Sequence, residues 1–408
     1  MTHKMTKTFA IATCLTLLGS CNEKAAEEQA ESLAVFNRIG LLQSISTNVM
    51  TPRLTDFSTS ATSLHSTFET QCSALSGTIL GSAQLQNMKT AWVSTMKIWQ
   101  EIEAFQLGPI SENSFAKRYD IYSWPNLSPC AVDTQVSALV TATNASYTLP
   151  DNAYYPRGLG AIEYLLYDTD LDHGCSATTT ETQNWNARSA NDRSTYRCQY
   201  LVKVADDLKT KAAELLTAWG DESSGYAETF LAAGTDVELQ TRLSSVSEGL
   251  FYLDLKTKDR KLAIPLGISS KCYSFPCLTD IEHRSSALSL GAVESNIKGF
   301  AAIYRGYSES SGKSEGVGFD DYLTDTDYAT EKSNMDAAVT AALEKAASLS
   351  SESLETKIGA LSGKCASADD SDVCSMYYKV KDITDLLKGE FSKVLKLDIP
   401  STAASDND

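Results

Sequence analysis

The residues best suited to chemistry in this 408-residue chain fall into three short motifs. In the first motif, Trp92, Trp99 and Glu103 are spaced seven and four residues apart, so a helix would project them from nearly one face. A carboxylate beside two tryptophans either pairs with a partner in a partly buried position or lines a cleft. The tryptophans could also be ordinary core residues, so this motif leaves both interpretations open.

The second motif runs from Arg157 to Glu163 and contains Gly158 and Gly160. Glycines allow another part of the backbone, or a ligand, to approach closely. The acid that follows them stands near the expected start of a helix, where a negative charge is favourable even without a ligand. Binding and a purely structural role are therefore both compatible with this motif.

The third motif is the run from Glu282 to Ser286, which we expect to open a helix over residues 287–305. Ser285, within this run, offers a hydroxyl for hydrogen bonding. Glu282 could contribute its carboxylate to a site or remain solvated in the first helical turn. Whether these motifs form one site depends on how the elements that carry them pack together.

Helices are the elements that must position the motifs. Only 22 glycines and 9 prolines interrupt the chain, and 42% of its residues are hydrophobic, enough for a sizeable core. Apolar residues recur at three- and four-residue steps, and no run alternates strictly as a half-buried strand would. Such stripes occupy residues 83–106, 196–219, 236–256, 286–305, 331–349 and 373–395. The sequence therefore predicts an all-α fold, with a disordered tail over residues 399–408.

An internal repeat divides these helices into two groups. Residues 158–165 align with residues 316–323, and a helical stripe precedes each segment. The repeat predicts two similar helical bundles. With a boundary near residue 222, the bundles would span residues 34–222 and 223–398, and each is long enough for four helices.

The first residues of the chain predict export. Residues 1–20 have a positive start and an apolar stretch too short to span a bilayer, as a signal peptide does. The boundary Leu-Gly-Ser-Cys resembles a bacterial lipobox, so we expect cleavage before Cys21, lipidation of that cysteine and a flexible tether over residues 21–33. Asn22 favours the outer membrane of the cell envelope as the destination. An ordinary secretory signal is the alternative.

Charge and cysteine content narrow the partners and the compartment. The formal net charge of −17 disfavours nucleic acid as a partner and favours cations or basic proteins. Beyond the signal and the lipid site, the number of cysteines is even, which predicts disulfides in an oxidising compartment. Short loops favour three pairs, in this order: Cys272–Cys277 and Cys365–Cys374, then Cys175–Cys198. A zinc site is the alternative, but no second closely spaced cysteine pair complements the first.

Taken together, the motifs resemble those of the imelysin-like proteins. The resemblance rests on several segments in the same order along most of the mature chain: residues 91–109, 120–125, 157–166, 259–267, 281–285, 296–300 and 316–323. It implies export or lipid anchoring, two similar four-helix bundles, and a functional site in the cleft between the bundles. The family was named for a peptidase, and some of its members belong to bacterial iron-uptake systems.

One departure from the family pattern bears on the chemistry. The signature of the family is glycine, any residue, histidine, two residues and glutamate, whereas this chain has Gly160 where the histidine stands. A histidine three residues before Glu163 could share a metal with it, which is why the pattern resembles a metallopeptidase site. Without that imidazole, and with no His-Glu-x-x-His zinc motif elsewhere, a metallopeptidase is the less favoured alternative. We therefore predict a non-catalytic role.

The predicted site is a ligand-binding cleft between the bundles. Glu103 and Glu163 would offer oxygen ligands to a metal, and iron or another divalent or trivalent cation suits such hard donors. The other residues assigned to the cleft are Trp92, Trp99, Asp120, Arg157, Gly158, Gly160, Glu282 and Ser285. The predicted function is to bind a metal or small ligand in iron uptake or homeostasis, with an envelope iron-uptake protein as a partner. A surface lipoprotein with a structural or partner-binding role is a further alternative.

Overall fold

The computed structural model describes residues 36–75, 78–142, 146–150, 153–325, 328–394 and residue 403. Over these residues the chain is helical and contains no β-strand, which confirms the all-α prediction. The predicted signal peptide, the lipidation site Cys21, the tether and the tail lie outside the described residues, apart from residue 403. No helix in the described part is both long and apolar enough to cross a bilayer.

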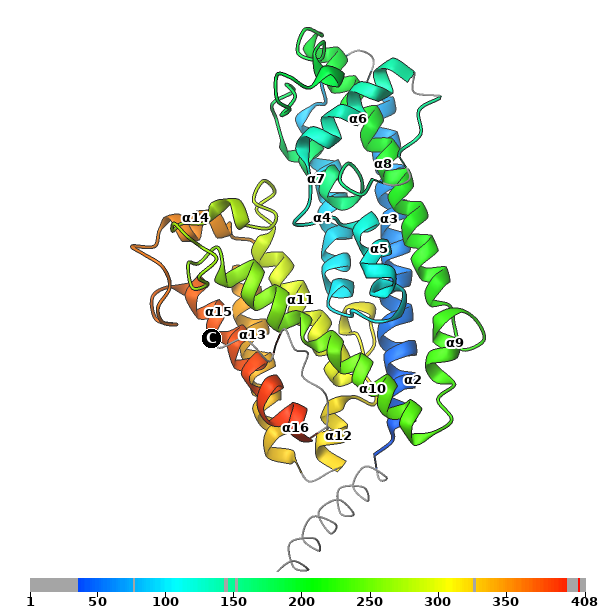
Figure 1. The fold of residues 1–408 in the computed structure, drawn as a ribbon, viewed down its shortest axis with the longest axis vertical. Helices are drawn as coiled ribbons and strands as arrows, with labels where there is room; N and C mark the ends of the chain where they lie inside the picture. The colour runs from blue at the N-terminus through cyan, green and yellow to red at the C-terminus, as the bar shows by residue number, and fades with distance from the viewer. Residues whose placement is uncertain are drawn as a thin grey trace, which may run out of the picture.

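Three long helices organise the first half of the chain (Figure 1). α3 (Thr51–Ser73) lies against both α4 (Ser82–Glu103) and α8 (Ala190–Trp219), and α7 (Gly158–Tyr167) packs on α4 and α8. Their hydrophobic stripes form one core, in which Trp92, Trp99 and Trp219 are fully buried. The shorter elements of this half are α2 (Arg38–Ser44), η1 (Ile45–Met50), η2 (Gly108–Ile110), α5 (Glu112–Ile121), α6 (Pro129–Ala142), η3 (Thr180–Thr182) and α9 (Gly225–Leu231).

The second half is built around α11 (Ser289–Arg305), α13 (Ala329–Leu349) and α15 (Asp372–Leu386). α13 packs against α11 and α15, and the π-helix η4 (Leu253–Ala263) also lies against α11 and α15. The remaining elements are α10 (Asp236–Leu250), η5 (Leu278–Asp280), η6 (Glu309–Ser311), α12 (Phe319–Asp325), α14 (Leu354–Gly359), η7 (Leu387–Phe391) and α16 (Ser392–Val394).

α4 and α11 join the two groups of helices (Figure 1). Gly299 on α11 lies so close to the backbone of Glu101 on α4 that a Cβ at this position would collide with it. One turn earlier on α11, Asn296 donates from Nδ2 to the backbone carbonyl of Gln100 at 2.6 Å. Because glycine lets the two backbones approach, polar side chains of α4 reach those of the second half.

Residues that precede α3 lie against the second half of the chain. Phe36 packs edge-on against Tyr322, with ring centroids 4.6 Å apart. The hydroxyl of Ser44 accepts a hydrogen bond from the backbone N–H of Val317 at 2.8 Å. Since the chain crosses between the two groups here, the bundle limits at residues 34, 222 and 398 stay a prediction.

The described cysteines form four disulfides: Cys72–Cys198, Cys130–Cys175, Cys272–Cys277 and Cys365–Cys374. The two short-loop pairs are confirmed, whereas the predicted Cys175–Cys198 pair is wrong. Cys198 on α8 meets Cys72 of α3 because these two helices pack together, and Cys175 lies beside the start of α6. Helix packing, rather than loop length, decides both of these pairs. Four disulfides indicate an extracytoplasmic protein.

Candidate functional site

Glu163 and His283 meet where α7 faces the segment before α11. Oε2 of Glu163 lies 2.7 Å from Nδ1 of His283, and Ser286 donates from its hydroxyl to Oε1 of Glu163 at 2.7 Å. Glu163 thus pairs with an imidazole that comes from the other half of the chain.

The segment before α11 aims His283 inward. The helix begins later than expected, at Ser289, and the residues from Glu282 to Ala287 form turns instead. His283 has a left-handed φ of 55°, which residues other than glycine adopt rarely and at an energetic cost. Its ring stacks on Tyr122, with centroids 5.5 Å apart, so packing helps to hold the strained backbone in place.

Glu282 continues the polar network on the far side of His283. Tyr122 donates from its hydroxyl to Oε1 of Glu282 at 2.9 Å, and Nζ of Lys261 lies 3.0 Å from Oε2. Lys261 also donates to Oε1 of Gln100 at 2.6 Å. Glu282 is only 1% exposed, so the interpretation of this acid as a solvated first-turn residue is wrong.

Glu103 ends the network on α4. Its carboxylate is fully buried and accepts hydrogen bonds from Arg118 and from the hydroxyl of Tyr252, the latter at 2.7 Å. Nζ of Lys261 lies 3.5 Å away. Burial would raise the pKa of Glu103, but Arg118 and Lys261 outweigh this effect and hold the pKa below its usual value. Glu103 is therefore an ionised carboxylate with its own cations.

Charges alternate along the whole network. Three carboxylates face three basic groups: Glu163, Glu282 and Glu103 against His283, Lys261 and Arg118. Burial alone would lower the pKa of His283, but the neighbouring carboxylates outweigh burial and raise it above its usual value. The anions and cations balance only when His283 is protonated, and this balance offsets part of the cost of burying the charges.

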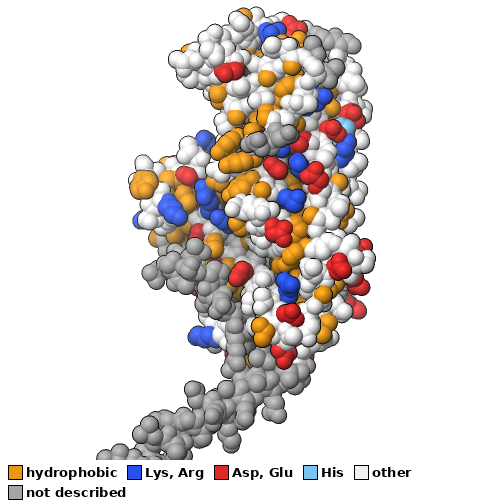
Figure 2. Space-filling model, turned by 45° about the vertical axis from the view of Figure 1, so that its right-hand side comes forward, with side chains coloured by type: hydrophobic (Ala, Val, Ile, Leu, Met, Phe, Trp, Pro, Cys, Tyr) orange, Lys and Arg blue, Asp and Glu red, His pale blue; other side chains and the backbone are white. Residues whose placement is uncertain are grey.

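A cleft of about 440 Å³ opens at the Glu163 end of this network. Its lining comes from both halves of the chain: α7, the residues after α5, η4, and the segment before α11. Figure 2 shows a hollow on this side of the molecule, with hydrophobic side chains on its wall and Lys and Arg side chains along its lower edge. The size suits a small molecule.

Gly160 forms part of the wall of the cleft. The atoms nearest to a Cβ on this residue would be Leu127 Cδ1 at 3.5 Å, Leu127 Cδ2 at 3.8 Å and the Ser123 hydroxyl at 3.8 Å, so a methyl group fits here in ordinary van der Waals contact. Gly158 differs, because its φ of 69° and its close contact with the backbone of Ile121 exclude a Cβ. Gly158 therefore positions α7, whereas Gly160 shapes the cleft.

The two tryptophans predicted for the cleft lie in the core. Trp99 packs against Phe57, with centroids 5.2 Å apart. Trp92 donates from Nε1 to the backbone carbonyl of Leu159 at 2.9 Å, and its ring meets His283 edge-on at 5.6 Å. Trp92 thus supports the site from behind, and Trp99 stabilises the first half.

Arg157 and Asp120 join α7 to its neighbours instead of lining the cleft. Arg157 is buried, and its guanidinium forms ion pairs with Asp120 at 3.6 Å and with Asp207 of α8 at 3.7 Å. Its Nη2 donates to the backbone carbonyl of Pro150 at 2.6 Å. These contacts fix the entry into α7.

The third motif supplies one hydroxyl to Glu163, but from a different serine. Ser285 lines the cleft and forms no hydrogen bond to another described residue, whereas Ser286 binds Glu163. The sequence interpretation missed the other partners in the network: Gln100, Arg118, Tyr122, Tyr252, Lys261 and His283. His283 could have been predicted from the sequence, since it lies inside the third motif beside Glu282.

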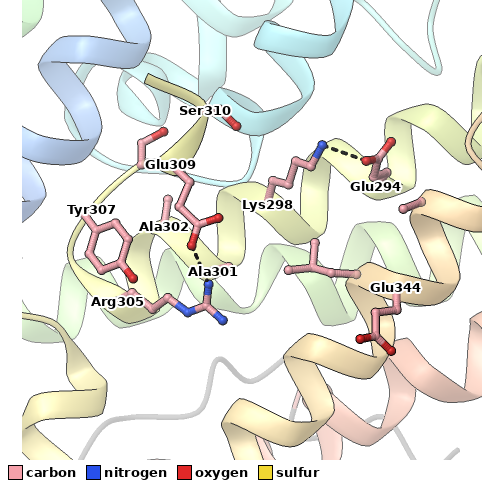
Figure 3. Close-up of a pocket in the computed structure, with 12 residues that line it drawn as sticks. Glu294, Lys298, Ala301, Ala302, Arg305, Tyr307, Glu309, Ser310 and Glu344 are labelled. Atoms are coloured by element: carbon pink, nitrogen blue, oxygen red, sulfur yellow. Dashed lines mark hydrogen bonds and ion pairs between the residues drawn. The ribbon is translucent and has the colours of Figure 1, made fainter. Parts of the chain in front are cut away.

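A second hollow, of about 310 Å³, lies between α11 and α13. Charged side chains at its edge pair with one another: Lys298 with Glu294 at 2.7 Å, and Arg305 with Glu309 at 3.1 Å (Figure 3). None of the residues predicted for the site lines it. The cleft beside Glu163 is therefore the candidate site.

The described residues do not fit a resident metal ion. Within the part of the chain that the structure describes, no three His, Cys, Asp or Glu side chains gather as a metal site requires. Glu103 is occupied by Arg118 and Lys261, and Glu163 by His283. The geometry thus gives no support to a metal held between Glu103 and Glu163.

Comparison with known proteins identifies the family. The family model for imelysin matches residues 50–372. The chain belongs to the imelysin family. An imelysin-like protein from Psychrobacter arcticum 273-4 has a similar fold, with a TM-score of 0.62 and 16% identity over 88% of this chain and 96% of that chain. A structure described as that of an iron-regulated protein A precursor from Parabacteroides distasonis ATCC 8503 has a TM-score of 0.61 and 16% identity, over 88% and 94% of the two chains. No curated protein matches.

Within the imelysin family signature, this chain keeps the glutamate as Glu163 and replaces the histidine by Gly160. His283 approaches the same carboxylate from the other half of the molecule. The pairing of a carboxylate with an imidazole is therefore present, and Gly160 lines the cleft.

Proposed function

We propose that this imelysin-family chain is a non-catalytic, lipid-anchored binding protein of the bacterial cell envelope that takes a small ligand in the cleft beside Glu163. The observation that carries the proposal is the cleft itself. It is lined by both halves of the chain, and the carboxylate–imidazole pair of Glu163 and His283 stands on its wall.

The network behind the cleft supports binding rather than catalysis. His283 and Glu163 hold each other, the hydroxyl of Ser286 donates to the Glu163 carboxylate and not to the imidazole, and the described cysteines are oxidised. Residues locked in this way form a preorganised wall.

The link to iron rests on one structure of similar fold, which is described as that of an iron-regulated protein A precursor. Because Glu163, Glu282 and Glu103 are already matched by internal cations, iron would enter the cleft as part of a small ligand and not as a bare ion. An envelope iron-uptake protein would then be the partner that delivers or receives this ligand. Lipidation of Cys21 would keep the protein at the membrane.

Filling the cleft tests this function in cells. Gly160→Trp places an indole in the space beside Leu127, whereas Gly160→Ala adds only a methyl group. Under iron limitation by a chelator, we expect cells with Gly160→Trp to grow as poorly as cells that lack the protein. Cells with Gly160→Ala should grow like wild type, and iron supplementation should abolish the difference.

Three results would overturn parts of the proposal. Equal growth of deletion and wild-type cells under iron limitation would remove the iron role. Cleavage of casein by wild type, lost in Glu163→Gln, would make the protein a peptidase. Unchanged membrane association of Cys21→Ala, with no acyl mass on the mature wild-type N-terminus, would remove the lipid anchor.

A further inference from the structure

The cleft carries a positive charge that no described side chain neutralises. Arg260 of η4 lines the cleft and is half-buried, with its guanidinium carbon 5.3 Å from the ring centroid of Trp124. Among the residues described, no carboxylate pairs with it and no acceptor binds it. Its N–H donors are therefore available to a ligand in the cleft.

The other charged side chains around the cleft are engaged or exposed. Arg284 forms two hydrogen bonds to Glu355, at 3.0 and 2.6 Å, so its charge is already matched. Glu163 is held by His283. Asp280 is exposed at the mouth of the cleft. Arg260 thus differs from Arg284, the other arginine that lines the cleft, because it has no carboxylate partner among the described residues.

Further cations surround Arg260. Nζ of Lys261 lies 5.7 Å from the Trp124 ring, on which Arg260 also stacks. One turn earlier on η4, desolvation and repulsion by Arg118 and Arg260 lower the pKa of Lys256. Lys261 and Arg118 already have carboxylate partners in the network, so the unmatched positive charge among these groups on the cleft is that of Arg260.

We propose that the cleft binds a small organic anion whose carboxylate pairs with Arg260. The proposal rests on the proposed function, because it names the ligand class of the same cleft. A guanidinium and a carboxylate form two parallel, charge-assisted hydrogen bonds, and stacking on Trp124 holds the guanidinium plane. Carboxylate chelates of iron belong to this class of ligand.

Citrate and its uncharged triethyl ester provide a matched pair of probes. We expect isothermal titration calorimetry on the mature lipidated protein in detergent to detect citrate binding and none of triethyl citrate. Arg260→Gln should weaken citrate binding by about tenfold or more, the loss of one charge-assisted contact. Arg260→Lys should recover only part of this affinity, because an ammonium cannot bind both carboxylate oxygens side by side.

Arg305→Gln is the matched control variant, since Arg305 borders the second hollow and pairs with Glu309 (Figure 3). It should bind citrate like wild type. Absence of citrate binding by wild type, or equal affinity of Arg260→Gln and wild type, would overturn the anion proposal. If either result came with a growth defect of Gly160→Trp under iron limitation, the proposed function would stand and the ligand would belong to another class.

Discussion

The two copies of the internal repeat, at the starts of α7 and α12, have similar sequences and different uses. Glu163 of the first copy aligns with Asp321 of the second. Glu163 reaches out of its helix to His283, whereas Asp321 turns back and accepts a hydrogen bond from the backbone N–H of Gly318 at 2.9 Å. One acid belongs to a site between the halves, and the other caps its own helix.

The glycines that precede these acids differ in the same way. A Cβ on Gly160 would meet no atom closer than 3.5 Å, but a Cβ on its counterpart Gly318 would collide with the backbone of Tyr304 and Arg305. A repeated motif can therefore keep its local fold while only one copy acquires a binding surface. The difference arises from the elements around each helix, because α7 lines the cleft and α12 is packed against α11.

The largest expected difference between the two copies is in the loss of stability when a nearby lysine is replaced: Lys261 in the network of Glu163, and Lys332 beside α12. Lys261→Met should lower the free energy of unfolding by about 3–5 kcal/mol, because it leaves the buried carboxylate of Glu282 without its lysine and removes one of the two cations beside Glu103. Lys332→Met, which removes a partly exposed partner of Asp320, should cost less than about 1 kcal/mol. Urea unfolding of the two variants measures both values. Equal losses would show that the network at α7 is no more tightly coupled than the surface pairs at α12.

Alanine at the two glycines should have effects of opposite sign. Gly318→Ala forces a backbone shift and should cost about 1–3 kcal/mol. The added methyl group of Gly160→Ala would meet no atom closer than 3.5 Å. Because alanine favours a helix more than glycine does, this substitution should stabilise the protein by about 0.5–1 kcal/mol. Thermal melts of the two variants test this, and destabilisation by Gly160→Ala would mean that the space in the cleft wall is smaller than described.

The histidine makes the stability of the α7 site dependent on pH. Because the pKa of His283 is raised in the folded protein, its stabilising contribution is complete below the unfolded pKa of about 6.5 and is lost as pH rises through the folded pKa. The loss is about 1.4 kcal/mol for each unit by which folding raises the pKa. Melting temperatures measured from about pH 6 to 9 should fall more steeply for wild type than for His283→Gln. Parallel curves would contradict a protonated His283.

The smallest effect is expected at the cap of α12. Asp321→Ala removes the acceptor for the Gly318 backbone N–H and should cost about 1 kcal/mol. Citrate affinity should stay at the wild-type value, because Asp321 does not line the cleft. A change in affinity without further loss of stability would show that the second copy also contributes to binding.

Much of the fold could be predicted from periodicity. The stripes at 83–106, 196–219 and 331–349 correspond to α4, α8 and α13 within a few residues, because one buried face repeats every three or four positions. The stripe at 286–305 began too early, because the residues before Ser289 form turns around His283. Periodicity follows apolar residues only, so it could not predict that the polar segment around His283 is buried.

The predicted site was partly assembled from motif spacing. Glu103, Glu163 and Glu282 do belong to one network, although Glu103 and Glu163 stand at its opposite ends. Their partners Lys261 and Tyr122 could not be paired with them from the sequence, since 160 residues separate Tyr122 from Glu282. Charge alternation across helices appears only when the helices are placed.

By itself, the sequence determined the helices, the even set of cysteines, the short-loop disulfides and the presence of an acid at position 163, because these depend on spacing along the chain. Only the tertiary structure decided that Cys72 pairs with Cys198, that His283 pairs with Glu163, and that Arg260 lines the cleft without a carboxylate partner. These outcomes depend on which helix faces meet, and close packing at Gly299 brings the two halves together there. Local spacing cannot specify a contact between segments more than a hundred residues apart.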